Sequence, residues 1–345
     1  MKKSLLALAV LGAFAGVASA QSSVTLFGTV DLSAKYVKND GSDRRVSLSQ
    51  DGINSSQLGF RGTEDLGGGL KAGFLLLAGV NADTGTTNTK FFNRSAYVRL
   101  MGGFGEVRLG RDYTPTFWNN TIFDAFGTNG LGDSSHVGQL LAPTFVRADN
   151  SIGYFLPSGI GGVYGQAMVA ASEGASANPG RYVGGRIGFA AGPFDIAGAY
   201  AQQRLDATPG AASQKTFNIG GSYDLGVVKL MGYYDRDTLS YTGFNKKEDR
   251  YSFSGVVPLG QGEIHAGYER SKLKNSIANN SNTVSQFAVG YVYNLSKRTA
   301  LYTTYSRVSN GNLSQNSVAG GSAQAAAPTA GGKSNGAEFG VRHFF

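Results

Sequence analysis

The feature that most constrains this chain is a two-residue periodicity that lasts longer than a strand of a soluble protein. In the segment 24–36, one side carries apolar side chains, namely Val24, Leu26, Val30, Leu32 and Tyr36. The other side carries Thr25, Thr29, Asp31 and Lys35. Soluble strands usually have about five or six residues, whereas a tilted strand that crosses a bilayer needs about ten. The pattern therefore predicts a membrane-crossing strand with one apolar and one polar face.

The same pattern recurs along the chain and predicts sixteen strands. They are expected near 24–36, 57–63, 70–81, 91–101, 104–112, 147–156, 161–171, 181–191, 194–203, 215–223, 227–237, 249–257, 263–273, 285–293, 298–307 and 338–345. Tight turns rich in Gly, Pro, Asn and Asp alternate with longer polar connections, at 38–52, 81–90, 172–180, 204–214, 238–248, 274–283 and 308–333. Short turns at one rim and long loops at the other are typical of an outer-membrane barrel. The predicted fold is all-β, a 16-stranded antiparallel transmembrane β-barrel.

The N-terminus has the three parts of an export signal. Lys2 and Lys3 are followed by the apolar segment 5–17 and by an A-x-A cleavage site at 18–20. We therefore predict a signal peptide at 1–20 and a barrel domain at 21–345. After the predicted signal peptide, the longest apolar run, 74–80, is far shorter than the about 18 residues of a spanning helix. There is no cysteine, and hence no disulfide framework.

A long insert at 113–146 interrupts the alternation after the fifth strand, so it is the third external loop. It contains the only tryptophan, Trp118, and also His136, Asp124 and Asp133. A structureless connection of this length is uncommon and is usually functional or disordered. Our hypothesis is that the insert folds into the lumen and narrows it, with Trp118 packed against the barrel wall.

Three stretches then resemble a known family, the general porins of Gram-negative β-proteobacteria. They are LGFRGTEDLGGGLKAGF at 58–74, FGEVRLGRD at 104–112 and NLSKRTALY at 294–302, and the opening SSVTLFGTVD at 22–31 resembles the family too. The resemblance covers essentially the whole mature chain. It implies a water-filled homotrimer in the outer membrane, in contact with lipid and lipopolysaccharide. It also implies that the C-terminal Phe345 is the signal read by the outer-membrane assembly machinery.

In this family a cluster of arginines on the barrel wall faces acidic residues of the inward loop. The resemblance assigns wall positions to Arg94 and Arg147 and a loop carboxylate to Asp124. Arg61 lies on the predicted lumen face and adds charge. Anion-selective relatives carry an arginine where Gln57 stands. They also carry an acidic residue at the position of Leu77, so the resemblance leaves the strength of selectivity open.

No catalytic or metal-binding pattern stands out. His136, His265 and His343 are far apart in the sequence, and motifs such as H-E-x-x-H, G-x-S-x-G and the P-loop are absent. The full sequence has a net charge of +8. Its basic residues form no contiguous run of the kind that binds nucleic acid. We expect no enzyme activity, no cofactor, no metal and no nucleic-acid partner.

The predicted function is passive diffusion of small hydrophilic solutes and ions, with a weak preference for anions. The alternative is a substrate-specific channel for sugars or small organic anions. A further role of the external loops in adhesion stays open. Four tyrosines are expected in an aromatic girdle or at a trimer contact, namely Tyr233, Tyr234, Tyr291 and Tyr293. The alternative is that they form a sugar-binding row.

Overall fold

The structure is a computed structural model that describes residues 23–141, 145–172, 181–205, 211–241, 243–275, 280–319 and 326–345. The predicted signal peptide at 1–20 lies outside these residues. Among the residues described, no helix is long and apolar enough to cross a membrane.

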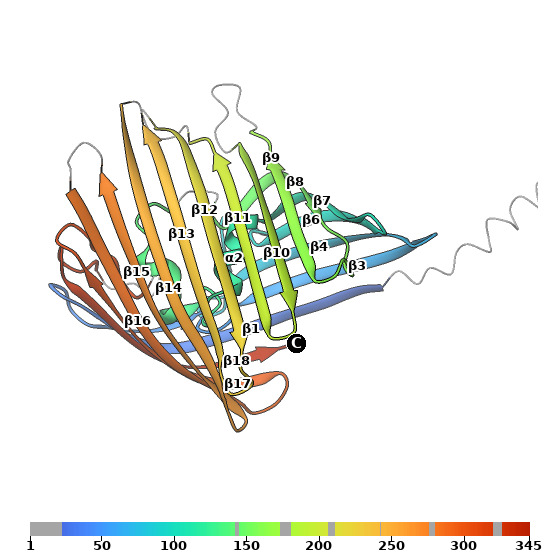
Figure 1. The fold of residues 1–345 in the computed structure, drawn as a ribbon. Coiled ribbons are helices and arrows are strands. Elements are labelled where there is room, and N and C mark those ends of the chain that lie inside the picture. Colours follow the sequence, from blue (N-terminus) through green and yellow to red (C-terminus); the bar gives the residue numbers. More distant parts are fainter. Residues whose placement is uncertain are drawn as a thin grey trace, which may run out of the picture.

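One antiparallel sheet closes on itself to form a barrel (Figure 1). Each wall strand pairs with the next along the chain, and the last strand, β18, pairs with β1. Two strand segments are additions to this wall. β2 pairs with the later half of β1 in line with β3, and β5 is a two-residue segment paired with β4. The other sixteen strands form the wall, which confirms the predicted fold class.

The strand bounds are β1 (Ser23–Asn39), β2 (Arg45–Gln50), β3 (Gln57–Gly67), β4 (Leu70–Asn81), β5 (Thr86–Thr87), β6 (Ser95–Gly102), β7 (Gly105–Tyr113), β8 (Arg147–Phe155), β9 (Val163–Ala170), β10 (Tyr182–Ala191), β11 (Phe194–Gln203), β12 (Ala211–Asp224), β13 (Lys229–Tyr241), β14 (Phe244–Leu259), β15 (Gly262–Asn275), β16 (Asn280–Asn294), β17 (Thr299–Asn310) and β18 (Lys333–Phe344). A short helix, α2 (Pro115–Ile122), and two 3₁₀ turns, η1 (Gly130–Gly132) and η2 (Ser134–Val137), lie between β7 and β8.

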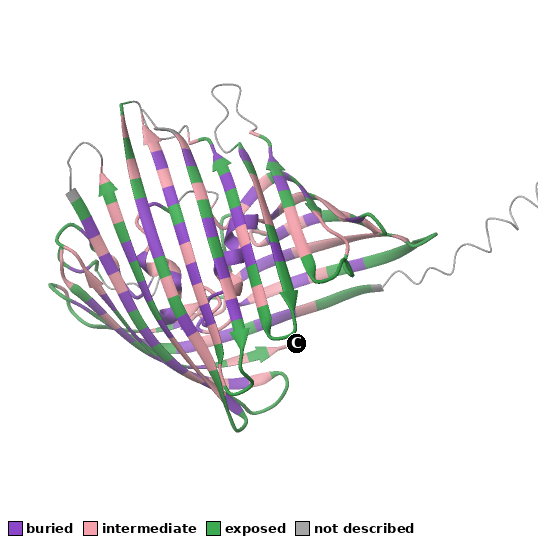
Figure 2. Ribbon diagram, viewed as in Figure 1, coloured by how far each residue is buried: buried purple, intermediate pink, exposed green. Residues whose placement is uncertain are grey.

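The wall has apolar side chains outside and polar side chains inside. In β1, Val24 and Leu26 are 65% and 56% exposed, whereas Asp31 and Ser33 are at most 1% exposed. Figure 2 shows this alternation as bands of buried and exposed residues along each strand. A soluble protein buries its apolar side chains instead. The reversed pattern fits a wall whose outer face meets lipid.

The tight turns lie where the sequence places them. Between β3 and β4, Gly67, Gly68 and Gly69 all have positive φ, at 84°, 60° and 80°, which only glycine adopts readily. The predicted loop at 238–248 was wrong, however. β13 and β14 continue through it and pair up to Tyr241 and Phe244, whose rings stack at 4.4 Å. Its polar composition suggested a loop, but Glu248 faces inward and binds the insert.

One of the aromatic residues expected in the girdle or at a trimer contact points the other way. Tyr233 is only 7% exposed, packs against Phe123 of the insert, and donates a 3.1 Å hydrogen bond to Asp235. Tyr293, by contrast, is 38% exposed near the end of β16. The insert therefore buries aromatic surface on the inner wall that the alternation alone could not assign.

Candidate functional site

The insert at 113–146 begins with the helix α2. Thr114 is its N-cap and accepts a hydrogen bond from the backbone N–H of Phe117, and Pro115 occupies the first turn. This Thr-Pro pair is a standard helix start, so the expectation of an irregular insert was wrong in its first part. Asp133 caps η2 in the same way by accepting from the Ser135 N–H.

The outgoing half of the insert follows the inner wall. Asn119 donates to Asn218 of β12 over 3.0 Å, and the two residues that flank Asn218, Phe217 and Ile219, are exposed on the opposite, outer face. The insert therefore lies inside the barrel. Further hydrogen bonds tie it to β14, β16 and β18 through the pairs Ala125–Ser254, Gln286–Leu131 and Leu131–Glu338.

The returning half is held by a buried carboxylate. Glu248 of β14 is fully buried and accepts hydrogen bonds from the N–H groups of Gln139 (2.9 Å) and Leu140 (2.7 Å). Ser271 donates a third bond to it over 2.6 Å. Asn316, from the connection between β17 and β18, donates to the carbonyl oxygens of His136 in η2 and of Gly138 directly after it. The insert is thus fixed from the wall and from another loop.

Asp124 holds the bend after α2. Its carboxylate is 6% exposed and accepts from the N–H groups of Phe126 (2.9 Å), Thr128 (3.0 Å) and Ser134 (3.3 Å). Burial, together with the nearby charge of Asp133, raises the pKa of Asp124 to about 6. Asp124 therefore acts first as an anchor within the insert.

Arg94 and Arg147 meet at one phenol. Each donates from Nη2 to the Tyr113 hydroxyl, over 2.8 Å and 2.7 Å, so the two guanidinium groups share one acceptor oxygen. The Arg147 guanidinium also lies 4.4 Å from the centre of the Tyr113 ring. Their shared partner is a hydroxyl and not a carboxylate, so it positions both guanidinium groups without adding a carboxylate charge.

These arginines line a cavity of about 540 Å³, which we call the arginine cavity. Gln57 and Leu77 line it from the wall, and Asp133 lines it from the insert. The full lining is Thr29, Asn54, Ser55, Gln57, Leu77, Arg94, Tyr113, Phe117, Trp118, Thr121, Gly127, Thr128, Asn129, Asp133, Ser135, Leu141, Phe145, Val146, Arg147 and Phe344.

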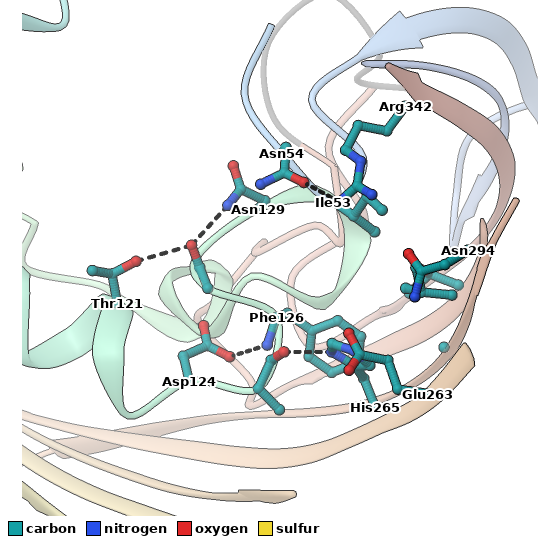
Figure 3. Close-up of a pocket in the computed structure, with 15 residues that line it drawn as sticks. Ile53, Asn54, Thr121, Asp124, Phe126, Asn129, Glu263, His265, Asn294 and Arg342 are labelled. Atoms are coloured by element: carbon teal, nitrogen blue, oxygen red, sulfur yellow. Dashed lines mark hydrogen bonds and ion pairs between the residues drawn. The ribbon is translucent and has the colours of Figure 1, made fainter. Parts of the chain in front are cut away.

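A second cavity of about 480 Å³, the mixed-charge cavity, lies against the last strands (Figure 3). Arg342 donates to Asn54 over 3.1 Å. His265 Nδ1 lies 2.5 Å from the Ala125 carbonyl oxygen, and its Nε2 lies 2.9 Å from Glu263. The lining is Ile53, Asn54, Thr121, Asp124, Ala125, Phe126, Gly127, Asn129, Glu263, His265, Gly290, Val292, Asn294, Thr304 and Arg342.

The predicted site residues therefore separate. The structure brings Arg94, Arg147 and Gln57 to one cavity and places Asp124 at the other. Arg61 is exposed on β3, with its guanidinium 4.8 Å from the centre of the Phe27 ring, and it lines neither cavity. Phe345 exchanges backbone hydrogen bonds with Gly28, over 3.0 Å and 3.1 Å, and so joins the chain end to β1.

The comparisons with known proteins agree with this geometry. The model of the Gram-negative porin family matches residues 7–313. The chain belongs to this family. It is 38% identical to outer membrane porin protein 32 of Delftia acidovorans over the full length of both chains.

Two solved structures show the same fold as this porin. The anion-selective porin from Comamonas acidovorans superposes with a TM-score of 0.84 and 36% identity, covering 94% of this chain and 100% of that one. OmpT of Vibrio cholerae, in a trimer form, superposes with a TM-score of 0.71 and 15% identity, covering 94% and 99%. The chain is thus an outer-membrane porin, a channel for passive diffusion.

Sequence reasoning assigned no site role to three residues that line the cavities: Asp133, Tyr113 and Arg342. Asp133 lies in the insert together with Asp124, and only the course of the backbone decides which of the two lines the arginine cavity. Tyr113 ends β7 and Arg342 lies near the end of β18, so both resemble ordinary lumen-facing residues of a strand. Within the described residues, no group of three or more His, Asp or Glu side chains could hold a metal ion.

Proposed function

We propose that this porin favours anions and that the arginine cavity sets the preference. One observation carries the proposal: Arg94 and Arg147 are both held by the hydroxyl of Tyr113. Among the described residues that line the cavity, Asp133 is the single acid. Two positive charges facing one negative charge attract anions and repel cations at a narrow passage. The similarity to the anion-selective Comamonas porin supports the same sign of selectivity.

The direct test is the reversal potential of the purified protein in a planar bilayer under a gradient of potassium chloride. We expect stepwise conductance increases and a reversal potential that favours chloride. A reversal potential that favours potassium would overturn the role of the arginine cavity. If no steps appeared where a control porin inserts, the channel function itself would be contradicted.

We further propose that the porin is a homotrimer in contact with outer-membrane lipid and lipopolysaccharide, and that Phe345 is read by the assembly machinery. The trimer form of the Vibrio OmpT and the apolar outer wall support this proposal. We expect a trimer band on a gel before boiling. Deletion of Phe345 should lower the amount of trimer in the outer membrane, and an unchanged amount would contradict a signal at this residue.

We also infer that the chain is a channel and has no enzyme activity. Among the described residues that line the two cavities, the polar groups act as wall charges or as anchors of the insert, and none is a nucleophile hydrogen-bonded to a base. Detection of hydrolysis or group transfer by the purified trimer, and its loss in a cavity variant, would contradict this inference.

A further inference from the structure

The arginine cavity has an aromatic side that the passage of inorganic anions does not require. The Tyr113 ring contacts two other rings. Its centre lies 5.3 Å from that of Trp118, with 54° between the ring planes, and 5.6 Å from that of Phe117, with 8° between the planes. All three rings line the cavity together with the two arginines. Trp118, expected only to pack against the wall, is partly exposed there.

The same cavity carries aliphatic surface where a water-filled neck usually carries polar groups. Leu141 of the insert is 43% exposed although it lies inside the barrel. Leu77 borders the cavity at the position where the family resemblance places an acidic residue, and it is itself only 7% exposed. Exposed apolar surface beside water is unfavourable unless a ligand covers it. The cavity therefore combines a cationic wall with an apolar face.

We propose that the arginine cavity is a binding station for small aromatic monocarboxylates of the benzoate class. The carboxylate would be bound by Arg94 and Arg147, and the ring would lie beside Trp118. Guanidinium groups bind carboxylates through charge-assisted hydrogen bonds, and aromatic rings pack favourably on one another. Asp133 shares the cavity and disfavours a second negative charge on the ligand. The inference rests on the proposed anion preference and names the solute that this preference serves best.

The chain offers a direct reporter, because Trp118 is its only tryptophan. We would titrate the detergent-solubilised trimer with sodium benzoate and excite at a wavelength that benzoate does not absorb. Sodium acetate, benzyl alcohol and free N-acetyltryptophanamide are the controls. We expect a saturable change of the Trp118 emission with benzoate, and a much weaker response to acetate or to benzyl alcohol. Equal or non-saturating responses to benzoate and acetate would overturn the proposal.

A second measurement compares how benzoate and acetate block the chloride current through single trimers. The ratio of the two blocking constants cancels any change in conduction itself. We expect benzoate to block about five-fold more tightly than acetate, since one aromatic contact contributes a factor of this order. Trp118→Phe keeps a ring and should keep the preference, whereas Trp118→Leu should bring the ratio close to one. The same ratio in Trp118→Leu and in the wild type would contradict the aromatic station.

The two proposals fail in different ways. If chloride were not preferred but Trp118 still responded to benzoate, the anion preference would be wrong and the station would stand. If chloride were preferred and Trp118 did not distinguish benzoate from acetate, only the station would be wrong. Arg94→Gln together with Arg147→Gln should weaken the benzoate response about ten-fold, as the loss of charge-assisted hydrogen bonds predicts. An unchanged response would remove the arginines from the site.

Discussion

The two cavities of this barrel meet at four shared residues, Asn54, Thr121, Gly127 and Asn129, yet they treat charge differently. In the mixed-charge cavity, Arg342 shares the lining with two carboxylates, those of Asp124 and Glu263. In the arginine cavity, two guanidinium groups are held by one phenol. Arg342 is held by the amide oxygen of Asn54, and the carboxylates in the same lining offset its charge, whereas the hydroxyl that holds Arg94 and Arg147 adds no negative charge to their cavity. The partner of an arginine therefore matters as much as the arginine.

The largest effect should follow from releasing the returning half of the insert from the barrel wall. Glu248→Ala leaves the buried N–H groups of Gln139 and Leu140 without their acceptor, which costs roughly 2–6 kcal/mol. We expect the insert to detach while the barrel remains, so single-channel conductance should rise and become noisy. Glu248→Gln, which keeps one acceptor oxygen, should have a smaller effect. Normal conductance in Glu248→Ala trimers that still migrate as folded barrels would contradict this role of Glu248.

The next effect is a pH dependence of the stability of the insert. Burial raises the pKa of Asp124 from 3.8 to about 6, so the folded insert binds the proton more tightly than the unfolded chain does. Proton binding by Asp124 therefore stabilises the folded insert. This contribution to the free energy of unfolding is fully present below pH 3.8 and is lost as the pH rises through 6, by about 3 kcal/mol for a shift of this size.

Hydrogen exchange can measure this loss. After correction for the intrinsic rate, the amides of Phe126, Thr128 and Ser134 should be better protected at pH 4.5 than at pH 7.5. Asp124→Asn, which cannot ionise, should show a flat profile between these two values. Protection that rises with pH in the wild type would contradict the predicted loss of stability at higher pH.

A smaller effect is expected from a substitution that keeps the charges of Arg94 and Arg147 but releases their guanidinium groups. Tyr113→Phe keeps the ring and removes the oxygen that binds Arg94 and Arg147. Each hydrogen bond to a charged group contributes about 1.5–3 kcal/mol, so both guanidinium groups should become mobile. We expect a reduced chloride preference with little change in the stability of the trimer. Tyr164→Phe, which removes a hydroxyl that contacts Arg186 outside the cavity, is the matched control.

The smallest expected effect is an increase in the preference for chloride. Gln57 lines the arginine cavity at the position where anion-selective relatives carry an arginine by the family resemblance. Gln57→Arg adds a third cation and should raise the chloride preference by a factor of about two to five, which corresponds to about 0.5–1 kcal/mol. A fall in chloride preference, measured as a shift of the reversal potential toward potassium, would show that the cavity is not the selective passage.

The sequence predicted the wall well because two-residue periodicity is a local property. The apolar side of β1 at Val24 and Leu26 faces outward, as the alternation implies. The sequence-based prediction was wrong where long-range contacts determine the local structure. The predicted loop at 238–248 is mostly strand, since β13 and β14 pair up to Tyr241 and Phe244, and no local pattern reveals that Glu248 binds the insert.

The candidate site was only partly predictable for the same reason. Arg94 and Arg147 flank the insert in sequence, so any inward fold brings them near each other. Asp124 and Asp133 are nine positions apart in the insert, and three backbone N–H groups bind Asp124 at the mixed-charge cavity, whereas Asp133 lines the arginine cavity. That choice depends on the tertiary course of the backbone. The local signal that was available, Thr114-Pro115, locates only the start of α2.

Charge in the arginine cavity, and not charge elsewhere in the barrel, is proposed to set the selectivity. The measurement is the reversal potential of two double variants that lose the same net charge, Arg94→Gln with Arg147→Gln and Arg61→Gln with Arg342→Gln. The first pair should abolish or reverse the chloride preference, and the second pair should leave most of it. Equal shifts in the two variants, or an unchanged potential in the first, would contradict the claim.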